Sequence, residues 1–272
     1  MLPTDAWVRA HRTRSQAERF ASTYRFGRRW RWHYFAARYV RLRLHEVADA
    51  LGIERASQRV LDVGFGSGHL LASFPTSCRI SGAEVSRSAV DGARRDPAFA
   101  AYASAAFHPV REGSVGDLPS GPFDWVVSSH ALEHVPDDRA MLAAMFDRLR
   151  PGGWLGLFVP LEAPDHNPDH RHSYDLDEIA ARVAAAGFTL RFVEAGLHSH
   201  GHVWKLLTIP GRRRWPVLGP LVEAFRVVSL SLIPYRGHRL LDRWLGRLGV
   251  DPCQAFVLAQ RPAAQPVGSE RS

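Results

Sequence analysis

The feature that most limits how this chain can fold is the alternation of short apolar runs with helix-forming stretches from residue 59 onward. Apolar runs bounded by turn residues are typical of buried strands. Strand, helix and strand repeated in this order indicate parallel strands joined by right-handed crossovers, with helices on both faces. The sequence therefore predicts an α/β fold with a doubly wound, seven-stranded, mostly parallel sheet, formed by RVLDVG, RISGAEVS, FHPVREG, FDWVVSS, WLGLFVP, FTLRFVEAG and CQAFVLAQR.

Helical periodicity places four helices between these strands. They are expected from Gly68, from Ser88 into an alanine-rich stretch, from Arg139 to Leu149, and from near Asp175.

The segments around the sheet divide the chain into five parts. Residues 1–58 are expected to form an N-terminal helical arm rich in arginine and aromatic residues, and residues 59–198 the core. Residues 199–251 interrupt the sheet over roughly fifty positions, far more than an ordinary loop, which predicts a helical insertion or lid. Residues 252–262 supply the last core strand, and residues 263–272 are expected to be a disordered tail.

Composition narrows the class of protein. The net charge of +8 comes almost wholly from arginine, since Lys205 is the only lysine. This usage, with abundant alanine, glycine and proline, reflects coding bias in a GC-rich bacterial genome as much as selection, so the charge by itself is a weak argument for a nucleic-acid partner. Cys78 and Cys253 lack close-spaced partners, so neither a disulfide framework nor a cysteine metal site is expected. With no signal-peptide pattern and no charge-free window of about twenty residues, we expect a cytoplasmic protein.

Three glycines follow the first predicted strand in VLDVGFGSGHLL, at positions 64, 66 and 68. Glycine lets the backbone turn tightly and come close to a ligand. The spacing G-x-G-x-G lacks the extra residue of a dinucleotide loop, and no Lys-Ser or Lys-Thr follows as in a triphosphate loop. By itself the motif fits a ligand loop and a plain packing turn equally well. Glu84, at the end of the second strand, is placed to accept both hydroxyls of a ribose.

Four ordered blocks make the pattern more specific: DVGFGSG, AEVS, FDWVVSSHALEHVPDD and LRPGGWL. Over roughly Arg59 to Leu197 the chain resembles the class I S-adenosylmethionine-dependent methyltransferases, in particular the group with small-molecule methyltransferase domains. The resemblance implies a Rossmann-like fold and S-adenosylmethionine as cofactor, with S-adenosylhomocysteine as product.

The resemblance also assigns cofactor contacts. Asp62, Gly64, Gly66 and Gly68 would cradle the methionine end, and Glu84 would bind the ribose. Relatives often have aspartate where Ser114 stands, so adenine recognition is expected to use the Ser114 hydroxyl, main chain near Val115 or a water. Two roles fit Asp62, since it either accepts a hydrogen bond from the cofactor's amino group or holds the loop backbone. The remaining contacts are expected at Val85 and Ser129.

Histidines dominate the predicted acceptor side. Methyl transfer is an in-line displacement at a sulfonium carbon, so the protein must align an acceptor atom and take or tolerate its proton. His130 and His170 are the candidate catalytic bases, because the unperturbed pKa of histidine is about 6.5. His134, Arg171 and Tyr174 are the candidate substrate contacts, with a loop-clasp role as the alternative for the HRHSYD stretch.

No metal is expected. The chemistry does not require one, and the spacing of His166, His170 and His172 in a proline-containing loop matches no recognised closed site.

The arm and the insertion share arginine, tryptophan and large aliphatic residues, which suits three roles. A lid over the acceptor pocket is favoured, a membrane-surface contact comes second, and the apolar run VVSLSLIPY disfavours nucleic acid.

The expected activity is methyl transfer to an O or N atom of a small-molecule acceptor, namely a secondary metabolite, a sugar or a lipid-linked intermediate. In the last case the protein would act at the inner membrane surface. The alternative is a non-catalytic S-adenosylmethionine-binding partner subunit.

Overall fold

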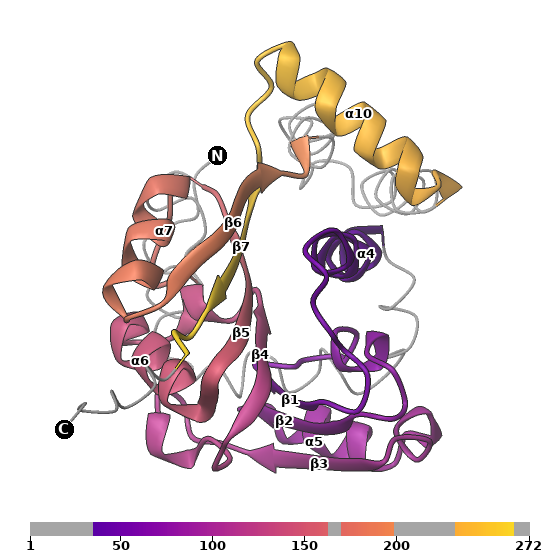
Figure 1. Cartoon of the computed structure of the whole chain (residues 1–272), viewed down its shortest axis with the longest axis vertical. Coiled ribbons are helices and arrows are strands. Elements are labelled where there is room, and N and C mark those ends of the chain that lie inside the picture. The colour runs from indigo at the N-terminus through magenta and orange to yellow at the C-terminus, as the bar shows by residue number, and fades with distance from the viewer. Residues whose placement is uncertain (1–34, 163–169, 199–231, 264–272) are drawn as a thin grey trace, which may run out of the picture.

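A computed structural model describes residues 35–162, 170–198 and 232–263 of the chain. Its centre is a seven-stranded sheet of order β3-β2-β1-β4-β5-β7-β6 (Figure 1). Strands β1 to β5 run parallel to one another, and β7 runs antiparallel to both β5 and β6. The predicted α/β fold with a mostly parallel sheet is thereby confirmed. The strands are β1 Arg59–Val63, β2 Arg79–Glu84, β3 Ser104–Pro109, β4 Phe123–Ser129, β5 Leu149–Pro160, β6 Thr189–Gly196 and β7 Gln254–Gln260.

Helices cover both faces of the sheet (Figure 1). Helices α6 (Asp138–Arg148) and α7 (Leu176–Ala185) pack on one face, and α4 (Phe35–Ala50) and α5 (Arg87–Arg94) pack on the other. Neighbouring residues of β1 divide between the two layers, since Leu61 belongs to the first core and Val60 to the second. Burial on both faces explains why the central strands are continuously apolar instead of alternating.

Helix α10 (Tyr235–Arg247) packs against α4 and belongs to the segment between β6 and β7. The His238 ring stacks on Phe35 with 5.6 Å between centroids. Glu194 of β6 accepts from Arg43 of α4 at 2.7 Å and from Arg239 of α10 at 3.1 Å. This joins the predicted arm and insertion to the sheet through residues that the structure describes. The structure does not describe the rest of these two parts, which is residues 1–34 of the arm, with Trp30 and Tyr34, and residues 199–231 of the insertion. Residues 264–272 of the tail also lie outside the described residues.

Two of the predicted helices are wrong in extent. The helix expected from Gly68 is only a 3-10 turn, η1 (Leu71–Ser73), because Gly68 has a φ of +76° and Pro75 follows closely. The Leu70 carbonyl accepts from both the amide and the hydroxyl of Ser73, three residues on, as in a 3-10 turn. The helix at Ser88 does not extend into the alanine-rich stretch. It stops at Arg94, since Pro97 begins η2 (Pro97–Phe99), and the alanines enter β3.

The other two predicted helices are confirmed. Helix α6 begins one residue before Arg139, and the Asp137 side chain caps it by accepting from the amide of Ala140. Helix α7 follows Asp175, whose side chain accepts from the amide of Glu178. Two further 3-10 turns, η3 (Val115–Asp117) and η4 (Leu132–His134), follow β3 and β4. No helix within the described ranges is long and apolar enough to cross a bilayer.

Candidate functional site

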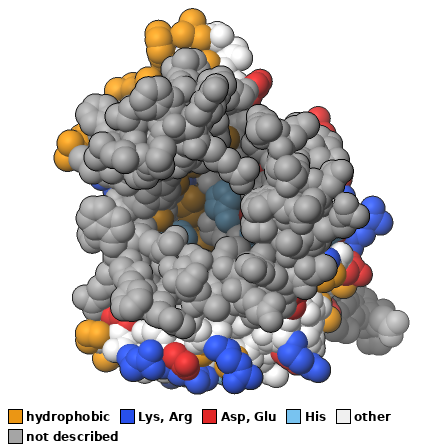
Figure 2. Space-filling model, turned by 180° about the vertical axis from the view of Figure 1, so that it is seen from behind, with side chains coloured by type: hydrophobic (Ala, Val, Ile, Leu, Met, Phe, Trp, Pro, Cys, Tyr) orange, Lys and Arg blue, Asp and Glu red, His pale blue; other side chains and the backbone are white. Residues whose placement is uncertain are grey.

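A pocket opens at the carboxyl ends of β1, β2 and β4, where ligands of open α/β sheets bind. It is partly open, and the space between its walls, open solvent included, is about 630 Å³. Figure 2 shows a hollow in this molecule whose visible floor is made of histidine and hydrophobic side chains. Six residues predicted from the sequence line the pocket: Gly64, Glu84, Val85, Ser114, His130 and His134.

The glycine loop has the backbone shape that only glycine adopts readily. Gly64, Gly66 and Gly68 have φ values of +75°, +50° and +76°. A Cβ on Gly64 would lie 2.3 Å from the Cβ of Ala131, in the loop after β4. The loop therefore forms a cradle at the pocket wall that a side chain at Gly64 would break.

Glu84 fastens this loop to β2. Its carboxylate accepts hydrogen bonds from the amides of Gly66 and Ser86, each at 2.9 Å. The side chain is 7% exposed, and burial raises its pKa although the backbone bonds act to lower it. A carboxylate has about four acceptor positions, so these two bonds do not exhaust its capacity to accept. The ribose assignment stays a prediction that this geometry suits.

Asp62 is buried under the loop with one oxygen unsatisfied. The residue is 2% exposed, and its Oδ1 has no hydrogen-bond partner within the described part of the chain. Burial raises the pKa of this carboxyl well above its usual range, and the charge of Glu84 adds to that effect. Buried polar atoms are nearly always hydrogen-bonded in native proteins. Of the two roles predicted for Asp62, the unsatisfied oxygen favours contact with a ligand amino group.

This geometry predicts that S-adenosylmethionine binding releases a proton. The raised pKa lets the unliganded protein hold a proton on Asp62 at a pH where an exposed aspartate is ionised, whereas an ammonium ligand requires the carboxylate. Affinity should therefore weaken as pH falls through the raised pKa. Calorimetry in two buffers of different ionisation enthalpy measures the release. Asp62→Asn should abolish it and weaken binding roughly 10- to 100-fold, the value of about 1.5–3 kcal/mol for a charged hydrogen bond. Equal proton release by the variant would contradict this role.

The part of the pocket expected to hold adenine includes a charged side chain that the sequence did not indicate. Ser114 lines the pocket, whereas Val115 begins η3 and does not. Arg111, which sequence reasoning missed, also lines it and bonds Asp117 at 2.8 and 2.9 Å. That pairing with Arg111 holds the pKa of Asp117 well below its usual range. The other predicted contact, Ser129, is the last residue of β4 and is not among the lining residues.

The acceptor side brings all three candidate histidines into one group with two glutamates. His130 Nε2 contacts Gln254 Oε1 at 2.9 Å, and its Nδ1 lies 3.6 Å from Glu133 Oε1. The His134 and His170 rings meet edge to face at 4.8 Å, and His170 Nδ1 contacts Glu162 Oε1. The sequence pattern indicated the three histidines as candidates, but it did not indicate a role for Glu133 or Glu162.

His130 carries two marks of a functional position. Its φ is +52°, a conformation that costs a non-glycine residue about 1–2 kcal/mol. Its side chain is 43% exposed toward the pocket that it lines. Partial desolvation acts to lower the pKa of His130, but the nearby Glu133 carboxylate outweighs it, so the pKa is raised. His69, also missed, stays neutral, because burial and then the charges of Arg41 and His130 lower its pKa to about 3.

Arg171 and Tyr174 differ in how they are placed. The Arg171 side chain pairs with Glu112 at 2.9 Å and is 46% exposed. Tyr174 is 2% exposed, and its hydroxyl donates to Asp138 at 2.9 Å inside the core, away from the pocket lining. This favours the loop-clasp alternative for Tyr174 over substrate contact.

Tyr174→Phe should therefore lower the free energy of unfolding without changing ligand binding. Removing the hydroxyl leaves the buried Asp138 carboxylate with fewer donors, which costs about 1–3 kcal/mol. Urea unfolding measures the loss, and S-adenosylmethionine affinity and acceptor KM should match the wild type. A rise in acceptor KM at unchanged stability would restore the substrate-contact role.

Comparison with known proteins agrees with this geometry. A family model described as a methyltransferase domain matches residues 31–192. The trans-aconitate 2-methyltransferase of Mycobacterium tuberculosis is 34% identical over 128 residues, which are 45% of this chain and 45% of the relative. The ubiquinone biosynthesis O-methyltransferase of Neisseria meningitidis is 28% identical over 155 residues, 56% of this chain and 58% of the relative. The chain thus spans about half the length of the curated relatives it matches.

A solved structure shares the fold. Haemonchus contortus phosphoethanolamine N-methyltransferase 2, solved with S-adenosylhomocysteine, aligns at a TM-score of 0.50 and 17% identity, over 80% of this chain and 52% of that one. The family match covers more than half of the chain, and it spans the glycine loop, Glu84 and the histidine group. The chain belongs to the methyltransferase-domain family, with the fold and the motifs of the class I S-adenosylmethionine-dependent methyltransferases.

Proposed function

We propose that this protein transfers a methyl group from S-adenosylmethionine to an oxygen atom of a small-molecule acceptor. The observation that carries the proposal is the group of histidines and glutamates beside the pocket, because an O–H acceptor must lose its proton and His130 would receive it. Both curated relatives compared above carry methyltransferase names for small molecules. The alternative acceptor is a nitrogen atom, whose methylation depends less on a general base than that of an O–H group.

The residues of the pocket suit the cofactor. The unsatisfied Oδ1 of Asp62 suits the amino group of the methionine end, the loop of Gly64, Gly66 and Gly68 leaves room beside it, and Glu84 suits the ribose hydroxyls. S-adenosylmethionine supplies an electrophilic methyl group on a sulfonium. The protein's own part is to hold the acceptor in line, to receive its proton at His130, and to balance the resulting charge with Glu133.

An acceptor screen tests the proposal. Purified protein with S-adenosylmethionine is offered carboxylic acids, phenols, sugars and amines, and S-adenosylhomocysteine formation is followed by mass spectrometry. Turnover with an oxygen acceptor is the expected result. His130→Ala should then lower kcat by roughly 10²- to 10⁴-fold, the usual contribution of general-base catalysis. Normal turnover by that variant would remove His130 as the base. Cofactor binding with no turnover on any acceptor would favour the partner-subunit alternative.

A lipid-linked acceptor at a membrane surface is the finer form of this proposal. Helix α10 exposes an apolar stripe in which Leu240, Trp244 and Leu248 are 61%, 57% and 61% exposed. Exposed arginines flank the stripe at positions 236, 243 and 247. Apolar residues bordered by arginine suit the interface of an anionic bilayer.

Sedimentation with lipid vesicles tests this contact. The protein should bind vesicles containing phosphatidylglycerol and not those of phosphatidylcholine alone, and Trp244→Ser with Leu240→Ser should weaken binding at least tenfold. Leu51→Ser, at an exposed leucine outside α10, is the matched control and should bind normally. If the α10 variant binds as tightly as the wild type, the stripe has no role in membrane contact.

A further inference from the structure

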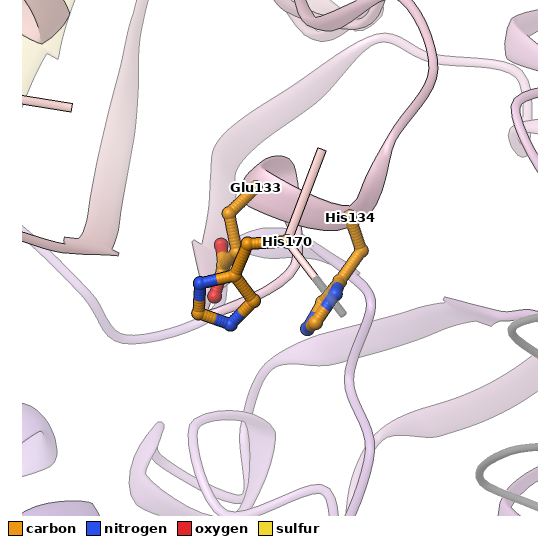
Figure 3. Close-up of side chains that lie close together, drawn as sticks. All are labelled: Glu133, His134 and His170. Atoms are coloured by element: carbon orange, nitrogen blue, oxygen red, sulfur yellow. The ribbon is translucent and has the colours of Figure 1, made fainter. Parts of the chain in front are cut away.

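Three potential metal ligands meet at the acceptor side of the pocket. Glu133 and His134 belong to η4, and His170 comes from the segment after β5, so two distant parts of the chain converge (Figure 3). One ligand atom from each residue lies within 4.8 Å of the other two. A metal ion lies about 2.0 to 2.2 Å from each ligand atom of this kind. The three side chains therefore need to move toward one another by only about an ångström to bind one ion.

Glu133 is buried, and its present neighbours do not supply enough positive charge to compensate its carboxylate. The residue is 1% exposed, and its Oε2 has no hydrogen-bond partner within the described residues. His130 lies near the other oxygen, at 3.6 Å. A buried carboxylate oxygen without a donor costs several kcal/mol unless a cation compensates it. The unsatisfied oxygen is therefore a second observation, independent of the clustering, that points to a ligand.

His170 already has the partner that metal-bound histidines use. Its Nδ1 contacts the carboxylate of Glu162, and the side chains of the two residues are 12% and 13% exposed. In metal sites, a carboxylate that holds one ring nitrogen fixes the tautomer and leaves the lone pair of the other nitrogen for the ion. Nε2 of His170 is then the ligating atom.

We propose that Glu133, His134 and His170 bind one divalent transition-metal ion, with Glu162 as the outer carboxylate. Two imidazoles and one carboxylate form a donor set that suits zinc or a similar ion, whereas magnesium and calcium prefer oxygen ligands alone. The expectation of no metal rested on a chemistry that does not require one and on the spacing of the loop histidines, and it did not include Glu133; the proposal departs from it.

An open coordination position would face the acceptor, since His134 also lines the pocket. This part of the inference rests on the proposed function. A bound ion would act as a Lewis acid on the acceptor oxygen and favour loss of its proton. As in the proposed function, His130 would receive that proton while the O–CH3 bond forms and the S–CH3 bond breaks.

Metal titration of the whole chain tests the site without using activity. Protein dialysed against a chelator is titrated with Zn²⁺ and with Mg²⁺ by calorimetry, and with Co²⁺ by its visible absorption. One Zn²⁺ per chain, a tetrahedral Co²⁺ spectrum and no Mg²⁺ binding are expected. Failure of the wild type to bind either transition ion would overturn the proposal.

Variants locate the ion. His170→Ala and Glu133→Gln should each abolish the Co²⁺ spectrum, and Glu162→Gln should weaken Zn²⁺ binding about 10- to 100-fold, as losses of outer partners do. His108→Ala, at a half-buried histidine of β3 outside the cluster, should bind like the wild type. His170 and Glu162 are partly exposed, so their variants keep the test valid if Glu133→Gln does not fold. Wild-type Zn²⁺ affinity in a folded His170→Ala protein would refute this ligand set.

A parallel titration with S-adenosylmethionine separates this proposal from the proposed function. Normal cofactor binding by the metal-site variants, together with lost metal binding, is the expected pattern. Absent cofactor binding in the wild type would count against the function, and absent metal binding would count against the ion.

Discussion

Gly64→Ala is expected to destabilise the protein and to abolish S-adenosylmethionine binding. The added Cβ would lie 2.3 Å from the Cβ of Ala131, and the backbone φ of +75° already disfavours any side chain. The conformational cost is about 1–2 kcal/mol, and the forced overlap adds about 1–3 kcal/mol. The loop must move away from β4 to relieve the contact, which deforms the wall that holds the cofactor. Urea unfolding and calorimetry measure the two effects.

Gly249→Ala is the matched control. Its φ of +77° is nearly the same, and nothing lies within 4 Å of an added Cβ. This variant should lose only the conformational part of the stability and should bind cofactor normally. If both variants lose equal stability and both bind S-adenosylmethionine, the close approach of the two loops has no part in forming the pocket.

Glu84→Ala is expected to weaken S-adenosylmethionine binding by about 100-fold or more. Two hydrogen bonds from ribose hydroxyls to the carboxylate would be lost, each worth about 1.5–3 kcal/mol for a charged acceptor, and every 1.4 kcal/mol is tenfold in affinity. The amide of Gly66 would also lose its acceptor, so the loop loosens at the same time.

A change in the ligand separates these two contributions. S-adenosylhomocysteine and its 2′-deoxy analogue are titrated into wild type and into Glu84→Gln. If the carboxylate binds the ribose, the missing hydroxyl costs the wild type affinity and costs the variant much less, since coupled losses are not additive. Equal losses in both proteins would show that Glu84 acts on the loop alone.

The residues predicted for the cofactor side lie together at one edge of the sheet because that side is built from local order. Gly64 follows β1 and Glu84 ends β2, and the carboxyl ends of neighbouring parallel strands meet at one edge of the sheet. A reader of the sequence needs only the strand order to bring them together. The same reasoning placed His130 after β4, at the same edge.

Long-range contacts explain which parts of the site could not be predicted from the sequence. Glu133 joins the acceptor group because the loop after β5 folds back onto η4, where the amides of Arg171 and His172 both donate to the Glu133 carbonyl. Nothing in the spacing of HALEHV indicates that contact. Tyr174 turns into the core for a related reason, since its partner Asp138 lies 36 positions earlier.

In the two helices predicted with the wrong extent, glycine and proline residues outweighed the helical pattern of the sequence. The pattern after Gly68 is apolar enough for a helix, but the glycines and Pro75 leave space only for a single turn. The alanine-rich stretch has high helix propensity, yet Pro97 ends the helix before it, and pairing with β2 recruits the alanines into β3.

The central claim is that the pocket at the ends of β1 and β2 binds S-adenosylmethionine, and calorimetric titration of the purified chain tests it most directly. S-adenosylmethionine and S-adenosylhomocysteine should each bind once per chain with micromolar affinity, about −8 kcal/mol, and NAD should not bind because the loop lacks the dinucleotide spacing. Absence of binding by both sulfur ligands, or equal binding by NAD, would contradict the account.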